Sequence, residues 1–409
     1  MNQLTRRDFF KSAAVYSALG TVAPQFLTQT VEATTQAIAG FNNDRVLVVV
    51  QLAGGNDGLN MLVPYSNDAY YNARPGLALK KERLITINDD LAFNQKFSRM
   101  KNVYDNGQLA IIQGIGYPNP DRSQFRSMEI WHTASDSDEY ESTGWIGRYF
   151  DHECSGSARP QVGVSITKEH LQAFSSKKGY GVSFEDPKSF GWKEGKGHDS
   201  SNSFAELNAA TSNSDSNIDF LRHVTSNAIM SSKEVHKASE MAGQEMNRRG
   251  RTPLSRTLSN VAALIKNELS TRIYYVNAGG FDTHANQTGQ HDNLLNQVST
   301  GLEGFQNQLR KDGTADRVTT MIFSEFGRRV NENKSGGTDH GTAAPMFLMG
   351  ENVNAGLHGR TPSLTNLDQG DLKFTTDFRS AYADVLENWF AVDPVRILGK
   401  KFDPLKIIG

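Results

Sequence analysis

The sequence predicts an α/β fold, with a mostly parallel β-sheet sandwiched between helices. Strand-like apolar segments alternate along the chain with longer helical patterns, which is typical of such a sheet. The segment 45–52 (RVLVVVQL) is continuously apolar, as expected of a central strand that is buried on both faces. It runs directly into a glycine-rich polar turn, and later strands have similar polar neighbours. Loops at the carboxyl ends of strands are where ligands gather in this fold class.

The elements follow one another in a regular order. The patterns predict strands at 45–52, 109–116 and 161–166, helices at about 218–245 and 254–269, a strand at 272–277, a helix at 292–310, strands at 317–324 and 345–349, and a final helix at 377–390. Residues 171–218 differ from the rest, because they are rich in Ser, Asn, Gly and Lys and lack apolar periodicity. This segment predicts a long surface loop or a peripheral insertion.

The N-terminal residues resemble a twin-arginine export signal. Residues 4–11 (LTRRDFFK) precede an apolar stretch at about 13–27, and residues 37–39 (AIA) form a small-residue cleavage site. The alternative is an amphipathic first helix of the folded domain. We expect residues 1–39 to be removed and residues 40–409 to form a single domain in the periplasm or outside the cell, with the twin-arginine machinery as an export partner. The apolar stretch is too short and interrupted to span a bilayer, and no later segment is long and apolar enough.

Composition excludes several classes of function. The formal net charge of the 409 residues is −2, which gives no electrostatic basis for binding nucleic acid or anionic membranes. The chain has one cysteine, Cys154, so it has neither an intrachain disulfide nor a thiolate metal cluster. A metal site in this protein must therefore use oxygen and nitrogen ligands.

Three glycine-flanked clusters of acidic, histidine and arginine residues occupy the second half of the chain. They are residues 279–284 (GGFDTH), 323–328 (FSEFGR) and 337–341 (GTDHG). The first two follow predicted strands and the third precedes one. Carboxylates and imidazoles that converge at strand ends are suitable ligands for a divalent metal such as zinc.

Two of these clusters supply the strongest ligand candidates. Asp282 and His284 are two residues apart, so in an extended loop their side chains point to the same side. The alternative is an aspartate in a local turn beside an exposed histidine. In the pair Asp339-His340 adjacent side chains diverge, so we favour His340 as the ligand and Asp339 as a residue that orients it. The alternative for this pair is a surface position.

Glu325 and Arg328 follow the strand at 317–324, and several roles are open to them. Glu325 is a candidate metal ligand, a general base, or the ion-pair partner of Arg328. Arg328 is also a candidate for holding a phosphate or sulfate oxyanion, which its planar fork suits. Asp57, in the turn after the first strand, is a further ligand candidate. The glycines of this turn match neither nucleotide-binding fingerprint.

Ser123 and Ser127 are the candidate nucleophiles. They lie in 121–127 (DRSQFRS), which opens a predicted helix. A hydroxyl at a helix N-terminus beside a metal can be activated, and the helix amides help to bind an anion. The alternative is that Ser123 simply caps the helix. No G-x-S-x-G elbow is present, which disfavours a Ser-His-Asp hydrolase.

These motifs resemble the exported family called domain of unknown function 1501. The resemblance covers nearly the whole chain after the signal, and it rests on 51–60 (QLAGGNDGLN), 280–284 (GFDTH), 324–328 (SEFGR) and 338–341 (TDHG). That family is similar to the alkaline phosphatase/sulfatase superfamily. The resemblance implies a doubly wound α/β sheet with a two-metal centre at the strand ends.

The resemblance also implies roles for individual residues. It assigns a metal-bridging carboxylate to Asp57, the nucleophile to Ser123, one metal to Asp282, His284 and His340, and part of a second metal site to Glu325. The chain departs from the superfamily pattern, because Glu325-Phe326 replaces an Asp-His pair. One or two divalent ions are therefore expected, with zinc, manganese or calcium as the candidates.

Two functions follow from these expectations. The first is a metal-dependent hydrolase of small phosphate or sulfate esters, in which Ser123 or a water attacks and Arg328 binds the oxyanion. The second is a non-catalytic exported binding or assembly protein on a degenerate phosphatase-like scaffold. An oxidoreductase is suggested only by the export route, since no flavin, haem or iron–sulfur motif is present.

Overall fold

The computed structural model describes residues 43–154, 160–167, 170–178, 180–185, 233–238, 240, 252–267 and 269–409. The predicted signal peptide at 1–39 and its cleavage site lie outside these residues. So do most of the predicted insertion at 171–218 and much of the predicted helix at 218–245. The parts of these two segments that are described add a short helical piece at 233–238 and an edge strand to the main sheet.

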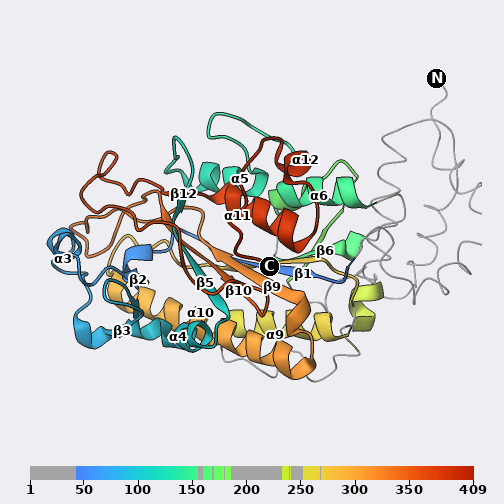
Figure 1. Ribbon diagram of the computed structural model, residues 1–409, viewed down its shortest axis with the longest axis horizontal. Coiled ribbons are helices and arrows are strands. Elements are labelled where there is room, and N and C mark those ends of the chain that lie inside the picture. Colours follow the sequence, from blue (N-terminus) through green and yellow to red (C-terminus); the bar gives the residue numbers. More distant parts are fainter. Residues whose placement is uncertain are drawn as a thin grey trace, which may run out of the picture.

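A large mixed sheet forms the centre of the molecule (Figure 1). Within the described ranges it has nine strands in the order β11-β5-β10-β9-β1-β8-β6-β7, with β12 also paired to β5. The strands are β1 (Val46–Leu52), β5 (Leu109–Gly116), β6 (Gly163–Ile166), β7 (Val182–Ser183), β8 (Ile273–Ala278), β9 (Val318–Phe323), β10 (Ala344–Met349), β11 (Gly356–His358) and β12 (Thr376–Asp377).

The central position of β1 explains its continuous apolar sequence. Leu47 and Val49 pack into one hydrophobic core, whereas Val46, Val48 and Val50 pack into another on the opposite face. Because successive side chains of a strand point to opposite faces, a strand covered on both sides must be apolar at every position.

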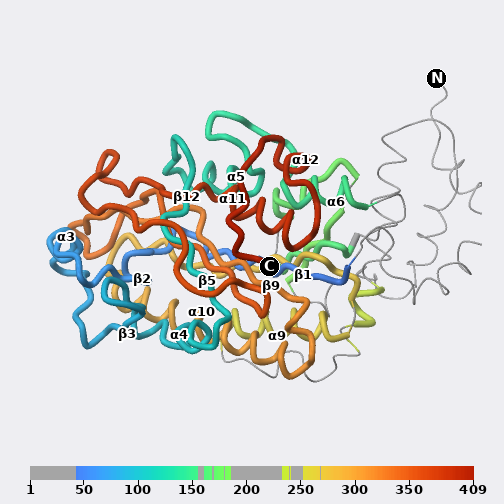
Figure 2. The backbone as a smooth tube through the Cα atoms, viewed as in Figure 1, coloured from blue at the N-terminus to red at the C-terminus, as the bar shows by residue number. Residues whose placement is uncertain are grey.

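Helices cover both faces of the sheet (Figures 1 and 2). One layer contains α4 (Ser98–Asp105), α9 (Pro253–Lys266) and α10 (Gln287–Asp312); the other contains α5 (Gln124–Thr133), α6 (Trp145–Glu153), α11 (Phe378–Asp384) and α12 (Pro394–Leu398). A π-helical turn, η9 (Val385–Trp389), continues α11. This three-layer arrangement confirms the predicted mostly parallel α/β fold with helices on both faces.

Shorter elements connect these layers. The single-turn helices are η2 (Gly58–Asn60), η3 (Lys81–Arg83), η4 (Gln95–Phe97), η5 (Pro160–Val162), η6 (Gln172–Phe174) and η8 (Ala315–Arg317). Helix α3 (Asp68–Ala73) lies beside a small antiparallel sheet made of β2 (Leu62–Val63), β4 (Ala92–Asn94) and β3 (Leu84–Thr86). No helix of the described part has the length and apolarity needed to cross a membrane.

Strand β10 runs antiparallel to both of its neighbours, β5 and β9. The other strands of the main sheet run in one direction. The amino end of β10 therefore lies at the same edge of the sheet as the carboxyl ends of its neighbours. A loop that precedes β10 consequently meets the loops that follow β1, β8 and β9.

Candidate metal centre

The loops that carry the predicted ligands begin at the same level of the sheet. Gln51 of β1 pairs with Asn277 of β8 on one side and with Phe323 of β9 on the other. The polypeptide leaves the sheet just beyond these positions, into the segments 53–58, 279–284 and 324–328. Strand register therefore brings together residues that are far apart in the sequence.

Two glycines allow these loops to approach closely. Gly54 has a φ of +111°, and a Cβ on it would lie 2.6 Å from the backbone nitrogen of Asp282. A Cβ on Gly337 would lie 2.3 Å from the carbonyl carbon of His284. Both distances are too short for a side chain, so glycine is needed at each position for the loops to pack together.

Asp282, His284 and His340 form a compact triangle of ligand atoms. The Nε2 of His284 lies 2.9 Å from the Oδ1 of Asp282, and the Nε2 of His340 lies 3.0 Å from the same oxygen. The two Nε2 atoms are 3.1 Å apart. Within the described ranges, this is the one group of three or more His, Cys, Asp or Glu side chains close enough to hold an ion.

The other nitrogen of each imidazole faces an oxygen acceptor. The Nδ1 of His340 lies 2.9 Å from the carbonyl oxygen of Arg122, and the Nδ1 of His284 lies 3.3 Å from the Oδ1 of Asp339. Because an oxygen acceptor favours hydrogen on Nδ1, each Nε2 is left with its lone pair. Two lone pairs and a carboxylate oxygen then face one another, an arrangement that a cation between them stabilises.

The triangle also fits the size of a metal site. A tetrahedral ion with ligands at about 2.0–2.1 Å separates its ligand atoms by roughly 3.3 Å. The observed separations of 2.9, 3.0 and 3.1 Å are a few tenths of an ångström shorter. Small side-chain movements would therefore open the triangle for an ion. The side chain of Asp282 is 48 % exposed and that of His284 is 45 % exposed, so the site is accessible from solvent.

Neighbouring groups hold His340 and Asp282 in place. The ring of Phe326 packs against that of His340, with centroids 4.4 Å apart. Burial raises the pKa of Asp282, but the contacts with His340 and with the positively charged Arg328 outweigh it and lower the pKa below its ordinary value. Asp282 is therefore an ionised carboxylate at neutral pH, as a metal ligand must be.

Arg328 organises the loops through hydrogen bonds within the protein. Its side chain is fully buried, and its Nη2 donates to the Oδ1 of Asp282 at 2.8 Å. The guanidinium also donates to the backbone carbonyl oxygens of Gly54, Gly55, Phe281 and Thr338. With its donors directed at the protein, the predicted role of Arg328 as an oxyanion ligand has no support in the geometry.

Asp57 is not brought to the triangle. It is fully buried, and its Oδ1 and Oδ2 accept hydrogen bonds from Nη1 of Arg74 at 2.9 and 2.7 Å. Oδ2 also accepts from the side-chain amide of Gln287. Burial raises the pKa of Asp57, but Arg74, His291 and Gln287 outweigh it and lower the pKa below 3.8. Asp57 was expected to bridge metal ions. In the structure it forms a buried ion pair with Arg74 and is not grouped with Asp282, His284 and His340.

Glu325 is also separate from the triangle. It is fully buried; Oε1 accepts from the backbone nitrogen of Gly54 at 2.7 Å, and Oε2 accepts from Nε2 of Gln51 at 3.1 Å. Among the described contacts, no ion pair joins Glu325 to Arg328. Burial raises the pKa of Glu325 above its ordinary value of 4.5. Glu325 thus supports the turn after β1, in place of the predicted second-metal ligand.

Ser123 is an exposed residue at the start of α5, and its neighbour in the chain, Arg122, contacts the triangle. It occupies the N-cap position, but its hydroxyl makes no capping hydrogen bond. The residue before it, Arg122, accepts from the Nδ1 of His340 through its carbonyl oxygen. Ser127, by contrast, is buried and donates to the carbonyl oxygen of Asp121 at 2.7 Å. Of the two candidate nucleophiles, only Ser123 is open to a substrate.

Three arginines near these residues were not predicted from the sequence. Arg74, the partner of Asp57, lies in a segment without a motif, so only the folded chain could identify it. Arg122 and Arg329 flank residues that the motifs did single out, Ser123 and Arg328. A basic residue beside a candidate nucleophile is the signal that could have identified Arg122.

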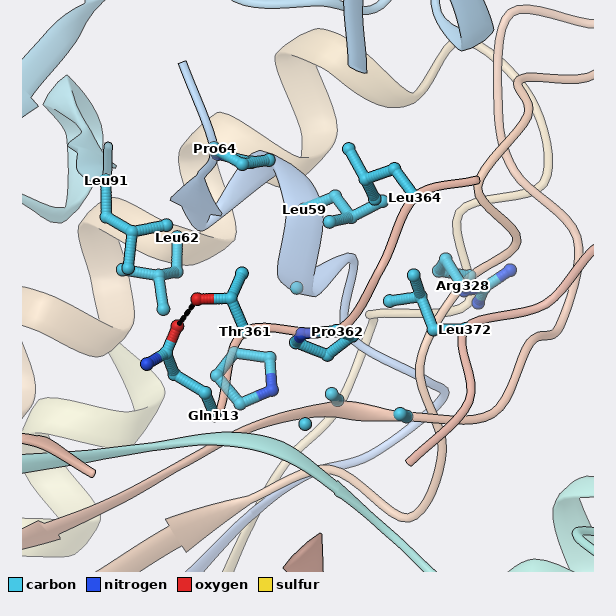
Figure 3. Close-up of a pocket in the computed structure, with 15 residues that line it drawn as sticks. Leu59, Leu62, Pro64, Leu91, Gln113, Arg328, Thr361, Pro362, Leu364 and Leu372 are labelled. Carbon is cyan, nitrogen blue, oxygen red and sulfur yellow. Dashed lines mark hydrogen bonds between the residues drawn. The ribbon is translucent and has the colours of Figure 1, made fainter. Parts of the chain in front are cut away.

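An apolar pocket is lined in part by Arg328, the residue that donates to Asp282 (Figure 3). Its lining is mainly leucine, proline, alanine and glycine: Gly58, Leu59, Leu62, Pro64, Leu91, Gln113, Gly114, Arg328, Ala343, Ala344, Pro345, Thr361, Pro362, Leu364 and Leu372. The polar pair within it is already satisfied, because Oγ1 of Thr361 donates to Oε1 of Gln113 at 2.7 Å. Arg328 lines the pocket while its guanidinium binds Asp282, so this residue stands between the pocket and the triangle.

Several solved structures are similar to this chain at low sequence identity. Ps i-CgsB in complex with k-i-k-neocarrahexaose is 8% identical, with a TM-score of 0.37 over 88% of this chain and 73% of that chain. A protein in the alkaline phosphatase superfamily from Vibrio parahaemolyticus is 8% identical, with a TM-score of 0.37 over 88% of this chain and 71% of its own. The lipoteichoic acid synthase LtaP from Listeria monocytogenes is 8% identical, with a TM-score of 0.29 over 79% and 70%.

Sequence comparison identifies a family. No curated protein matches the chain. A family model does match it, over residues 44–378, and this range contains the strands, the triangle and Ser123. The chain therefore belongs to the family described as "Protein of unknown function (DUF1501)", as its motifs predicted.

Proposed function

We propose that this protein is a metal-dependent hydrolase of phosphate or sulfate esters. The observation that carries the proposal is the triangle of Asp282, His284 and His340, whose ligand atoms lie 2.9, 3.0 and 3.1 Å apart. Both imidazoles have their Nδ1 atoms bound to oxygens, so their Nε2 lone pairs are free for an ion. We propose one ion, because Asp57 and Glu325 are bonded elsewhere.

The donor set narrows the choice of metal. Two imidazole nitrogens and one carboxylate oxygen suit zinc or manganese. Calcium prefers oxygen ligands alone, so two imidazole nitrogens make it a less suitable ion than zinc or manganese. With three protein ligands and an exposed triangle, the ion would keep a position open toward solvent, as catalytic zinc sites do.

Ser123 is the proposed nucleophile. Its hydroxyl is exposed, and the carbonyl of the preceding Arg122 is bonded to His340, so the start of α5 lies against the triangle. A divalent cation, when bound, would supply positive charge that favours an oxyanion. The protein's own contribution is to orient both imidazoles, to keep Asp282 ionised and to hold Ser123 nearby.

We place this activity outside the cytoplasm. The basis is the twin-arginine motif and the cleavage site within residues 1–39. Fusion of these residues to a reporter tests the placement. Replacing Arg6 and Arg7 with lysine should keep the reporter in the cytoplasm, and unchanged export would contradict the proposal.

A non-catalytic binding or assembly protein is the second candidate. It is favoured by the positions of Asp57, Glu325 and Arg328, because the residues expected to complete a two-metal catalytic site are buried and bonded to the protein. On this account the triangle holds an ion for structure or binding alone.

An ester screen with matched variants separates the two candidates. Full-length protein, exported and purified without chelators, is supplied with zinc or manganese and tested on aryl phosphate monoesters, phosphate diesters and sulfate esters. The hydrolase proposal predicts turnover that is lost in Ser123→Ala and His340→Ala. Ser142→Ala, at another exposed serine in the loop between α5 and α6, should retain it. Metal binding without turnover on any ester favours the binding protein.

A further inference from the structure

Two arginines from distant parts of the chain share one buried carboxylate. Asp371 is 1 % exposed and lies in the loop between β11 and β12. Its Oδ2 accepts from Nε of Arg122 at 2.6 Å, and its Oδ1 lies 3.6 Å from Nε of Arg329. Two positive charges thus meet one buried carboxylate, and the charge of Arg329 also interacts with that of Asp339. The two arginine side chains are 37 % and 38 % exposed, so a ligand can reach them from solvent.

The backbones of both arginines contact the metal triangle and its neighbours. The carbonyl oxygen of Arg122 lies 2.9 Å from Nδ1 of His340. The backbone nitrogen of Arg329 donates to the carbonyl oxygen of Asp339 at 3.0 Å, and the side chain of Asp339 contacts His284. Arg122 also directly precedes the exposed Ser123. Arg122 therefore adjoins the proposed nucleophile in the chain, and the charge of Arg329 acts on Asp339, beside the proposed metal site.

These two guanidinium groups retain donors for a ligand, unlike those of Arg74 and Arg328. Arg329 makes no side-chain hydrogen bond in the described part of the chain, and the Oδ1 of Asp371 that faces it accepts none. Arg122 contacts Asp371 through Nε and Nη2 only, so Nη1 remains. By contrast, the guanidinium of Arg74 binds Asp57 and two backbone carbonyls, and that of Arg328 is also fully buried.

We propose that Arg122 and Arg329 form an anion-binding pair for a tetrahedral oxyanion, the phosphate or sulfate group of the ester or of its product. The assignment of this anion to an ester rests on the proposed function; the binding of the anion itself does not. The planar, permanently charged fork of arginine suits such an anion, and Asp371 holds the two side chains at one place. The pair takes the role that the sequence assigned to Arg328.

The test is anion binding by the full-length, zinc-loaded protein, with inorganic phosphate and inorganic sulfate as probes in calorimetric titrations. Arg329→Ala should weaken binding at least about tenfold, as expected for a lost hydrogen bond between charged groups. Arg122→Lys keeps a charge near Asp371 but loses the fork, and it should also weaken binding. The matched control is Arg310→Ala, because Arg310 is likewise 38 % exposed and paired with one carboxylate, Glu351, but lies at the far end of α10.

The outcomes distinguish this inference from the proposed function. Weaker binding of either anion in both variants, with Arg310→Ala unchanged and circular dichroism preserved, supports the pair. Unchanged affinity in both variants overturns it, as does a wild-type protein that binds neither anion. If turnover depends on Ser123 while Arg329→Ala leaves KM unchanged, the pair is wrong and the hydrolase stands. If the variants lose anion binding but no ester is hydrolysed, the pair stands and the hydrolase is wrong.

Discussion

Asp282 and Asp57 both follow buried strands, yet their carboxylates have different surroundings. Asp57 is fully buried and its charge is compensated by Arg74. Asp282 is 48 % exposed and shares one oxygen with Arg328 and two imidazoles. A buried carboxylate with a complete set of partners stabilises the fold, whereas an exposed one beside two imidazole rings is suited to a cation.

Replacing Asp57 with asparagine should therefore affect stability and leave metal binding intact. The change keeps the size of the side chain but leaves the charge of Arg74 buried and unpaired, which costs about 3–5 kcal/mol. We expect the free energy of unfolding in denaturant to fall by this amount, while the folded protein keeps its metal stoichiometry. Loss of metal without loss of stability would instead restore Asp57 as a ligand.

The burial of Glu325 predicts how the stability of the fold depends on pH. Burial raises its folded-state pKa above the ordinary value of 4.5, so the folded protein holds this proton more tightly than the unfolded chain. The contribution of Glu325 to stability is then fully present below pH 4.5 and is lost as pH rises toward the raised pKa. Glu325→Gln should remove this part of the pH dependence.

Denaturant unfolding between pH 4 and 8 measures the effect. The difference in unfolding free energy between wild type and Glu325→Gln should grow as pH rises through that window, in favour of the variant. A difference that is constant with pH would show that the proton affinity of Glu325 is the same in the folded and unfolded states.

At the scale of elements, strand direction and loop packing create the site. The antiparallel β10 brings His340 to the edge where the loops after β1, β8 and β9 emerge. Buried Arg328 then ties three of these segments together through their backbone carbonyls. The positions of the ligands depend on how closely these loops can approach one another.

Gly54→Ala tests this dependence. The new Cβ would face the backbone nitrogen of Asp282 at 2.6 Å and would also occupy a positive φ. We expect a loss of more than about 1 kcal/mol in stability and a weaker metal affinity. Gly107→Ala is the control, because Gly107 has a φ of +73° but no neighbouring atom within 4 Å. Gly107→Ala should lose stability but keep the metal affinity of the wild type. Equal metal affinity in Gly54→Ala and Gly107→Ala would mean that the close approach of the loops does not position Asp282.

The observed strands and helices also show how much of the fold the sequence could predict. Apolar runs located β1, β5, β8 and β9 to within a residue or two, because burial on both faces gives each run an unbroken pattern. The start of α10 was wrong by five residues, since its first turn, from Gln287, is polar and gave no apolar signal. The antiparallel direction of β10 left no local signal, because parallel and antiparallel strands share the same side-chain periodicity.

The candidate site was predictable to a similar degree. Gly-flanked motifs identified Asp282, His284 and His340, which the structure brings together. Motifs could not separate them from Asp57 and Glu325, because a candidate ligand and a buried carboxylate bonded within the protein are the same residue type in the same kind of loop. The distinction depends on Arg74 and Gln51, which come from other elements.

At the scale of the whole molecule, two hydrophobic cores on opposite faces of one sheet enclose most apolar side chains of the described residues. The single cysteine belongs to one of these cores. Cys154 is fully buried, and burial raises the pKa of its thiol to about 12. Its thiolate is therefore nearly absent at neutral pH, and the sulfur has no access to solvent.

Cys154 should act as a reporter of global unfolding. In native protein at pH 8 we expect it to resist alkylation by iodoacetamide, and in denaturant we expect it to react at the rate of a free thiol. Mass spectrometry of quenched samples measures both rates. Rapid labelling of the native protein would mean that this part of the core opens without global unfolding.

We propose above all that Asp282, His284 and His340 bind a metal ion. Calorimetric titration of zinc into chelator-treated, full-length protein tests this, with His340→Ala and the surface control His152→Ala measured beside the wild type. We predict about one equivalent bound by wild type and His152→Ala. Affinity in His340→Ala should fall by more than about 100-fold, since even the outer partners of ligands change affinity roughly 10–100-fold. No binding by wild type, or equal affinity in His340→Ala, would contradict the account.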